Sequence, residues 1–245
     1  MYREYPSTSD VVACTWERRS NAPAVQLIVP DGCLDLVWFG DGRMELVGPD
    51  TSPRNVRTGH ADEIVGIRFA PGAARTVVGL PISELRDVQV SIASLGHRWA
   101  PCGELVEHLG RSPSTVRRTA LEAMAGQMVR SHPDALVRAA VQQLTSRPRQ
   151  RVGDLAETLG ISARHLQRRF VHEVGYGPKT FSRVVRLHRF LDLHRFLDTV
   201  NEQSDLSFAA VRAGYSSQSH LNDEFRALTS LTPVRFLEDN RRSAQ

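Results

Sequence analysis

The sequence predicts an α+β protein with three parts: a small N-terminal β-sandwich or barrel-like domain, a helical connector, and an all-α domain carrying two helix-turn-helix units. Two observations lead to this prediction. Apolar residues alternate along roughly the first seventy positions, as in strands, and give way to helical spacing further on. A helix-turn-helix skeleton then occurs twice in the last hundred residues. The expected bounds are residues 1–100, 101–147 and 148–240.

Length and composition are those of an ordinary globular protein. The chain has 245 residues, of which 41% are hydrophobic and 24% charged. These values exclude disorder, collagen-like repeats and a disulfide-stapled miniprotein for the whole chain. The longest apolar runs, such as residues 27–29, are far shorter than the ~20 residues that span a bilayer. No apolar signal stretch follows Met1, so we expect a cytoplasmic protein without membrane contact.

Strands are expected in the first seventy residues. Alternating apolar positions indicate them at 25–29, 34–38 and 44–46, and less strictly at 64–69. Turn signals separate these segments. Asp41-Gly42 lies between two apolar runs and is a typical hairpin turn. The pattern favours a small antiparallel sandwich or barrel.

Helical spacing begins near residue 72. A short helix is expected from Pro81, because proline is tolerated in a first turn. Longer helices are expected over 101–110, 113–131 and 133–145. Their apolar faces would be formed by Leu105, Leu109, Val116, Leu121, Met124 and Met128. The polar stretch 146–151, which contains Pro148, predicts a domain boundary.

The positive charge lies in the last hundred residues. Residues 1–146 hold 15 basic and 16 acidic residues, whereas residues 147–245 hold 16 and 11. The second part thus has a net charge of +5 and the first of −1. All basic residues except Lys179 are arginine, whose planar fork suits phosphate and guanine. This asymmetry suggests a C-terminal part that meets a polyanion.

The internal repeat joins residues 155–170 and 209–225, with Gly160 aligned on Gly214. In each copy a glycine ends a short helix, a serine can cap the next one, and a leucine and a phenylalanine four positions apart share a face of that next helix. The caps would be Ser162 in the first copy and Ser216 or Ser217 in the second. A helix of about 23 residues from Pro178 would separate the copies by roughly 34 Å, close to one turn of B-DNA.

The C-terminal region resembles the AraC/XylS family of transcription regulators over about residues 150–240. The motifs that carry the resemblance are Asp154-Leu-Ala-x-x-Leu-Gly-Ile-Ser162, His165-Leu-Gln-Arg-Arg-Phe170, Gly175-Tyr-Gly-Pro-Lys179, Ala213-Gly-Tyr215, Gln218-Ser-His-Leu221 and Thr232-Pro233. Residues 1–100 resemble a subgroup with a small β-rich domain, through Pro30-Asp-Gly-Cys-Leu-Asp-Leu36 and Arg68-Phe-Ala-Pro-Gly72.

The resemblance implies a nucleoid-associated regulator of promoters that reads double-stranded DNA with a bipartite domain and usually carries a separate effector or dimerisation domain. A small-molecule effector and RNA polymerase are then possible partners, and no cofactor is expected. The apolar helix faces within 101–145 favour a homodimer, although they could equally pack inside one chain.

The expected DNA contacts in the first unit project from the N-terminal half of its second helix. Leu166 and Phe170 face inward, which leaves Arg164, His165, Gln167 and Arg168 outward. The family's base-reading positions fall on Arg164, Gln167 and Arg168. Arginine can pair with a guanine edge and glutamine with adenine. Arg169, Lys179 and Arg183 are expected to contact phosphate.

The second unit departs from this pattern. Asp223 and Glu224 stand where the first unit has Arg168 and Arg169. Carboxylates near phosphates are repelled, so we expect the second unit to bind DNA weakly or to read few bases. Its expected contacts are Gln218, Ser219, His220 and Asn222.

A tandem hexapeptide lies in the long helix. Residues 187–192 read Leu-His-Arg-Phe-Leu-Asp and are repeated at 193–198. Six helical residues advance ~9 Å and rotate the helix by a net ~240°, which would turn the second unit off the shared DNA face. Either the copied apolar face packs on something new, or residues near 198–205 loop out and restore the register. We favour the loop.

Functions other than DNA binding have weaker support. Asp35, Trp38 and Arg68 could line an effector pocket, although such residues are more often structural. Cys33, Asp35 and His60 could be drawn as a catalytic set, but their spacing does not support one. The three cysteines and nine histidines form no metal motif, so neither catalysis nor a metal site is expected. The alternative is a sensory module whose helical domain docks a protein instead of DNA.

Overall fold

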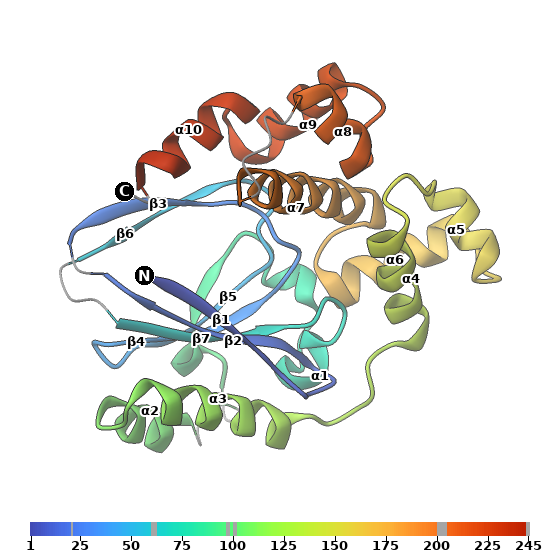
Figure 1. Ribbon diagram of the computed structural model, residues 1–245. Coiled ribbons are helices and arrows are strands. Elements are labelled where there is room, and N and C mark those ends of the chain that lie inside the picture. The colour runs from blue at the N-terminus through green and yellow to red at the C-terminus, as the bar shows by residue number, and fades with distance from the viewer. Residues whose placement is uncertain (21, 60–62, 97–98, 100–101, 200–204, 244–245) are drawn as a thin grey trace.

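The computed structural model describes residues 1–245 except 21, 60–62, 97–98, 100–101, 200–204 and 244–245. Strands fill the first part of the chain and helices the second, so the predicted α+β class is confirmed (Figure 1). No helix in the described ranges is long and apolar enough to cross a membrane.

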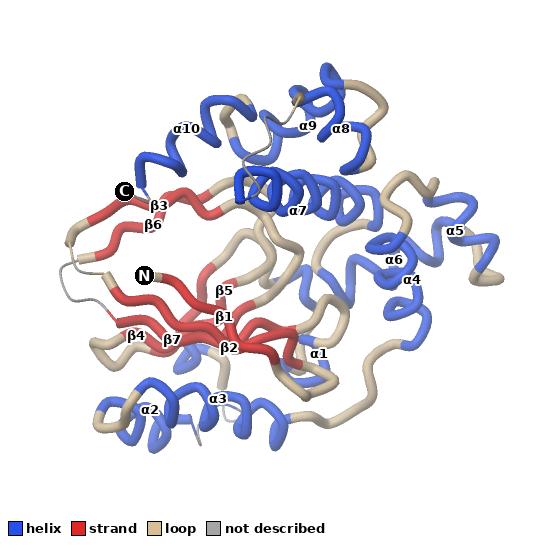
Figure 2. The backbone as a smooth tube through the Cα atoms, viewed as in Figure 1, coloured by secondary structure: helices blue, strands red, loops and turns tan. Residues whose placement is uncertain are grey.

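An antiparallel sheet forms the base of the N-terminal part and joins, among the described residues, six strands in the order β1-β2-β7-β4-β5-β8. A separate two-stranded sheet joins β3 and β6, on the side of the helices α7 (Pro178–Thr199) and α10 (Pro233–Ser243) (Figure 2). The strands are β1 Tyr2–Pro6, β2 Val12–Arg19, β3 Ala24–Ile28, β4 Asp35–Phe39, β5 Met44–Val47, β6 Arg54–Thr58, β7 Glu63–Phe69 and β8 Gln89–Ser91.

The expected hairpin at Asp41-Gly42 joins β4 and β5. The Phe39 N–H donates to the Arg43 carbonyl at 2.9 Å, and Gly42 adopts a φ of 89°, which glycine adopts without strain. Strands β1, β2, β6 and β8 were not predicted. The alternation in β2 is broken by a register shift between Val12 and Cys14, and the sequence of β6 is mostly polar.

Helices α2 (Cys102–Gly110) and α3 (Ser114–Met128) cover one face of the large sheet, together with α1 (Ala74–Val78). Leu109, Leu121 and Met128 are buried in this first core, as expected. Val116 does not share that face and is 41% exposed. Short 3-10 helices, η1 (Ile82–Glu84) and η2 (Ile92–Ser94), complete the N-terminal part.

The C-terminal helices build a second core. They are α4 Ala135–Ser146, α5 Val152–Thr158, α6 Ala163–Val174, α7 Pro178–Thr199, α8 Leu206–Ala213, α9 Gln218–Thr229 and α10 Pro233–Ser243. The segment 101–147, expected as one connector, therefore divides between two cores. Its helices α2 and α3 pack on the sheet, while Val137, Ala140 and Leu144 of α4 pack with the C-terminal helices.

The two parts meet at a domain junction beside α6 and α7. The loop before β4 brings Gly32, with a φ of 84°, against the side chains of Phe181 and Tyr176. His188 Nε2 lies 2.8 Å from the Pro30 carbonyl oxygen. On α1, the Arg75 guanidinium donates to the carboxylate of Glu173 at 2.8 Å. Glycine is required at position 32 because a side chain there would meet both aromatic residues.

Candidate nucleic-acid interface

The first helix-turn-helix unit consists of α5, a tight turn and α6. Gly160 follows α5 with a φ of 68°, and the Ser162 hydroxyl accepts from the backbone N–H of His165 at 3.2 Å. Leu166 and Phe170 on α6 are fully buried. The glycine turn, the serine cap and the inward face are as predicted, and they fix which side of α6 is left for a partner.

The second unit repeats this construction with α8 and α9. Asp205 caps α8, Gly214 ends it with a φ of 106°, and the Ser217 hydroxyl accepts from the His220 N–H at 3.1 Å. Of the two serines proposed as the cap, Ser217 is therefore the one used. Leu221 and Phe225 are fully buried, like their counterparts in the first unit.

Helix α7 separates the two units and spans 22 residues, or ~33 Å. The two copies of the hexapeptide lie in different surroundings. Phe190 of the first copy is fully buried, whereas Phe196 of the second is 62% exposed. The phenylalanines of the two copies thus face different sides, as the helical geometry predicts, whereas Leu191 and Leu197 are both buried. The loop expected near 198–205 falls mostly on residues 200–204, which lie outside the described residues.

Helix α6 presents the predicted reading side chains of the first unit. Arg164, Gln167 and Arg168 are exposed, and His165 is half-buried. The Gln167 amide lies over Gly177, where a side chain would force the amide to move. Lys179 is exposed at the start of α7. Within the described ranges, no carboxylate pairs with Arg164, Arg168 or Lys179.

Two arginines expected at phosphates already have protein partners. Two guanidinium nitrogens of Arg169 donate to the same carboxylate oxygen of Asp134, at 2.5 and 2.9 Å, and Asp134 also caps α4. Arg183 lies 3.5 Å from Glu224. Both remain partly exposed, so a phosphate contact stays a prediction for each. No sequence signal pointed to Asp134, because it lies 35 positions before Arg169.

Glu224 of α9 is turned inward and acts as an ion-pair centre. Its carboxylate lies 2.7 Å from Arg186 and 3.5 Å from Arg183 on α7, and 3.2 Å from His220 Nε2. These contacts neutralise the carboxylate and tie α9 to α7. The expected repulsion of phosphate is therefore limited to Asp223, which is exposed.

The expected DNA contacts of the second unit are partly engaged in its own turn. His220 Nδ1 accepts from the Ser216 N–H at 3.2 Å while Nε2 faces Glu224, so both ring nitrogens have protein partners. The Gln218 side chain accepts from the Ser207 hydroxyl at 2.8 Å. Ser219 is exposed and Asn222 is half-exposed.

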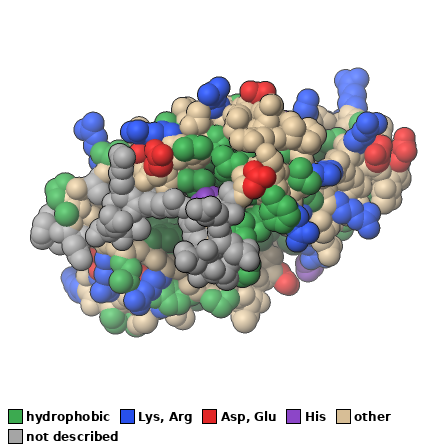
Figure 3. Space-filling view, turned by 45° about the horizontal axis from the view of Figure 1, so that its top comes forward, with side chains coloured by type: hydrophobic (Ala, Val, Ile, Leu, Met, Phe, Trp, Pro, Cys, Tyr) green, Lys and Arg blue, Asp and Glu red, His purple; other side chains and the backbone are tan. Residues whose placement is uncertain are grey.

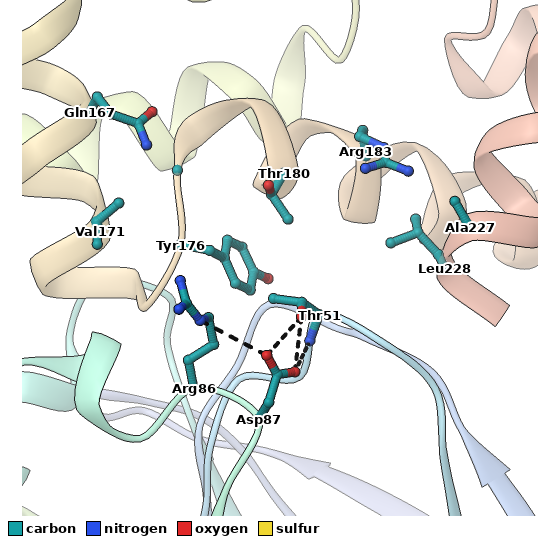
Figure 4. Close-up of a pocket in the computed structure, with 11 residues that line it drawn as sticks. Thr51, Arg86, Asp87, Gln167, Val171, Tyr176, Thr180, Arg183, Ala227 and Leu228 are labelled. Atoms are coloured by element: carbon teal, nitrogen blue, oxygen red, sulfur yellow. Dashed lines mark hydrogen bonds and ion pairs between the residues drawn. The ribbon is translucent and has the colours of Figure 1, made fainter. Parts of the chain in front are cut away.

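A polar pocket of about 520 Å³ lies between the two units and borders the domain junction (Figure 4). Gln167 lines it from α6, Thr180 and Arg183 from α7, and Leu228 from α9. Residues of the N-terminal part, Thr51, Arg86 and Asp87, close one side. The Tyr176 hydroxyl beside it is buried without a hydrogen-bond partner among the described residues, and burial raises its pKa well above the ordinary value.

Of the three residues expected to line an effector pocket in the N-terminal part, Asp35 and Arg68 lie together and Trp38 does not join them. Asp35 accepts from Arg68 at 3.1 and 3.2 Å and from Trp16 at 3.1 Å. Asp31 and Glu4 also pair with Arg68. Trp38 is 1% exposed and lies on the opposite face of the sheet, under the Arg117 guanidinium, because side chains alternate along a strand.

The catalytic set drawn from Cys33, Asp35 and His60 gains no support. Burial raises the pKa of the Cys33 thiol well above its ordinary range, which leaves little of the nucleophilic thiolate. His60 lies outside the described residues. Among the residues that the structure describes, no group of three or more His, Cys, Asp or Glu side chains could hold a metal ion.

Charged side chains on the helical end of the molecule are predominantly basic in the view of Figure 3. Two helix-turn-helix units joined by one helix define the class of protein: a helix-turn-helix DNA-binding protein. Comparison with protein families agrees, because residues 155–239 match a helix-turn-helix domain and residues 5–91 match a domain of unknown function, DUF6597. Residues 155–239 therefore form a helix-turn-helix domain of the AraC type, as the motifs of this region predicted.

Solved structures give more distant likenesses. The C-terminal domain of AraT, a response regulator from Geobacillus stearothermophilus, is 21% identical with a TM-score of 0.38 and covers 43% of this chain and 86% of its own. ToxT from Vibrio cholerae, at 1.65 Å resolution, is 11% identical with a TM-score of 0.49 and covers 91% and 97%. ToxT with a bound unsaturated fatty acid is 11% identical with a TM-score of 0.44 and covers 95% and 96%. No curated protein matches the chain.

Proposed function

We propose that this regulator binds promoter DNA mainly through its first helix-turn-helix unit. Arg164, Gln167 and Arg168 would contact base edges, and Lys179 would contact the backbone. The observation that supports the proposal is the contrast between the two reading helices. Helix α6 exposes two arginines that pair with no carboxylate in the described part of the chain, whereas α9 exposes Asp223 at the position of Arg168. An arginine on a guanine edge contributes ~1–3 kcal/mol of discrimination.

The proposal is tested by comparing Arg168→Ala with Asn222→Ala in a promoter shift assay. We expect Arg168→Ala to weaken binding by roughly 5- to 150-fold, the equivalent of ~1–3 kcal/mol, and Asn222→Ala to weaken it only slightly. Arg111→Ala, which changes an exposed arginine just after α2, serves as the control for the lost charge. Equal losses in the two reading helices would exclude a dominant first unit.

The N-terminal part is proposed to act as a sensory or dimerisation domain that modulates DNA binding in the cytoplasm, at the nucleoid. The domain junction supports this role, since it joins the sheet to α6 and α7 through Arg75, Gly32 and the Pro30 carbonyl. We place the limit between the two parts between α3 and α4, because each of these helices packs into a different core. Limited proteolysis should cut first near residues 129–134.

Docking of a protein partner remains the second candidate function, favoured only by the exposed Asp223. The salt dependence of DNA binding separates the two functions, because affinity for backbone phosphates falls steeply as salt rises. Specific binding that weakens with salt supports DNA as the partner. Absence of any DNA binding, with a stable folded protein, would favour protein docking.

A further inference from the structure

Arginine side chains gather around one pocket of the C-terminal domain, and none of them is a residue proposed to read DNA. The pocket, which we call the arginine pocket, has a volume of about 290 Å³. Arg147 and Arg149 line it from the α4–α5 loop, Arg189 from α7 and Arg212 from α8. Pro148 and Gly214 belong to its wall, and no carboxylate of the described residues lines it.

The wall of the arginine pocket is fixed by hydrogen bonds. Arg149 donates to the carbonyl oxygens of Val211 and Tyr215, each at 2.9 Å, and so holds the α4–α5 loop against the end of α8. The Pro148 carbonyl accepts from Ser182 at 3.1 Å and from Arg186 at 3.0 Å. The loop is therefore clamped to both α7 and α8, and the backbone positions of the arginines are set before any ligand arrives.

The other guanidinium groups of the pocket are not neutralised by the protein. Arg147, Arg189 and Arg212 are exposed, and within the described ranges none of them forms an ion pair. Two acidic residues of the neighbouring helices are paired elsewhere, Glu224 with Arg186 and Asp192 with Arg195. Like charges gathered around one hollow create a positive potential that attracts an anion.

We propose that the arginine pocket binds a phosphate group. Guanidinium forks match phosphate oxygens bidentately, and a phosphate offers more oxygens to several forks than a carboxylate does. The pocket lies at Gly214, in the turn that leads into α9. If the phosphate belongs to the DNA backbone, the second unit is anchored on DNA by charge and not by base reading. This attraction offsets the repulsion between Asp223 and the DNA phosphates. The inference that the phosphate comes from DNA rests on the proposed function, whereas the inference that a free phosphorylated molecule binds in the same pocket does not.

The test compares two triple variants of the full-length protein that lose the same charge. The pocket variant carries Arg147→Ala, Arg189→Ala and Arg212→Ala, and leaves Arg149 in place because it holds the loop. The control carries Arg3→Ala, Arg57→Ala and Arg111→Ala, at three exposed arginines of the N-terminal part. Fluorescence anisotropy measures binding to a selected promoter duplex over a range of salt, and thermal melts measure stabilisation by inorganic pyrophosphate.

A phosphate from DNA predicts a shallower slope of log affinity against log salt in the pocket variant. The slope should change by ~0.9 for each phosphate that the variant no longer neutralises, and it should stay the same in the control. A free phosphorylated molecule predicts an unchanged slope, with pyrophosphate raising the melting temperature of the wild type and the control but not of the pocket variant. Either result supports the phosphate pocket.

Equal changes of slope in the two variants, or no effect in either assay, would overturn the inference. The proposed function would still stand if the wild type binds DNA in a salt-dependent way. Conversely, a wild type that binds no DNA would contradict the proposed function, and the pyrophosphate melts would still decide whether the pocket holds phosphate.

Discussion

At the scale of single residues, two neighbouring carboxylates on α9 have opposite roles. Glu224 is mostly buried among Arg186, Arg183 and His220, whereas Asp223 projects into solvent. From the sequence the two were indistinguishable, since both replace arginines of the first unit. The difference arises from the helix geometry, which turns adjacent side chains ~100° apart.

Removing these charges one at a time should separate their roles. We expect Glu224→Gln to lower the free energy of unfolding by about 3 kcal/mol, because it leaves a largely buried arginine without its partner. Asp223→Asn should leave stability unchanged and strengthen DNA binding, because it removes a negative charge near phosphates. Chemical denaturation and a promoter shift assay measure the two effects. A large stability loss in Asp223→Asn would contradict the assignment.

Asp35 provides a second prediction at this scale. Burial raises the pKa of Asp35 to about 6, against the opposing effect of Arg68. A carboxyl whose pKa is raised in the folded state stabilises the fold at low pH, and this contribution is lost as pH rises from about 4 to about 6. We expect the wild type to lose on the order of 3 kcal/mol relative to Asp35→Asn over that range. Denaturation at each pH measures the difference, and a constant difference would contradict the raised pKa.

At the scale of elements, the sequence predicted those parts that local pattern controls. Helical spacing, glycine turns and serine caps located the second helix of each unit, and Leu166 and Phe170 are buried as expected. Long-range partners were not predictable, because Asp134 and Arg169, or Trp16 and Asp35, meet only after folding. Trp38 was grouped with Asp35 although three residues along a strand put two side chains on opposite faces.

The duplicated hexapeptide makes a prediction about α7. Deleting one copy gives the same sequence whichever copy is removed, and it keeps the buried environment of Phe190 while eliminating the exposed Phe196. The deletion withdraws ~9 Å and a net ~240° of helix from the linker. If α7 simply carries the extra turns, the variant should bind two half-sites one helical turn apart better than the wild type does. Binding assays on duplexes of varied half-site spacing measure this preference, and identical preferences would mean that the wild type already restores the register.

At the scale of the whole molecule, the domain junction couples the sheet to the reading domain. Gly32 lies at its centre, with Phe181 and Tyr176 within 3.0 and 3.2 Å of where a Cβ would be. Because α6 and α7 both contact this junction, a change in the N-terminal part can alter the position of the first helix-turn-helix unit. Only the folded chain reveals this coupling, since nothing in the sequence of residues 30–32 indicates a contact with α6 or α7.

A matched pair of glycine variants tests the junction. Gly32→Ala and Gly42→Ala both place alanine at a positive φ, of 84° and 89°, but only position 32 faces other side chains. We expect Gly32→Ala to destabilise the protein by ~1–3 kcal/mol more than Gly42→Ala and to separate the unfolding of the two parts into two transitions. Calorimetry measures both effects, and equal losses in the two variants would show that the junction does not contribute.

The central claim is that the first unit reads DNA and the second is held mainly by charge. Genome-wide binding-site selection with the purified full-length protein, at two salt concentrations, tests it most directly. The account predicts one recurrent half-site, flanked by a second region that has little sequence preference and whose contribution falls as salt rises. Two equally conserved half-sites, one helical turn apart and retained at both salt concentrations, would contradict it.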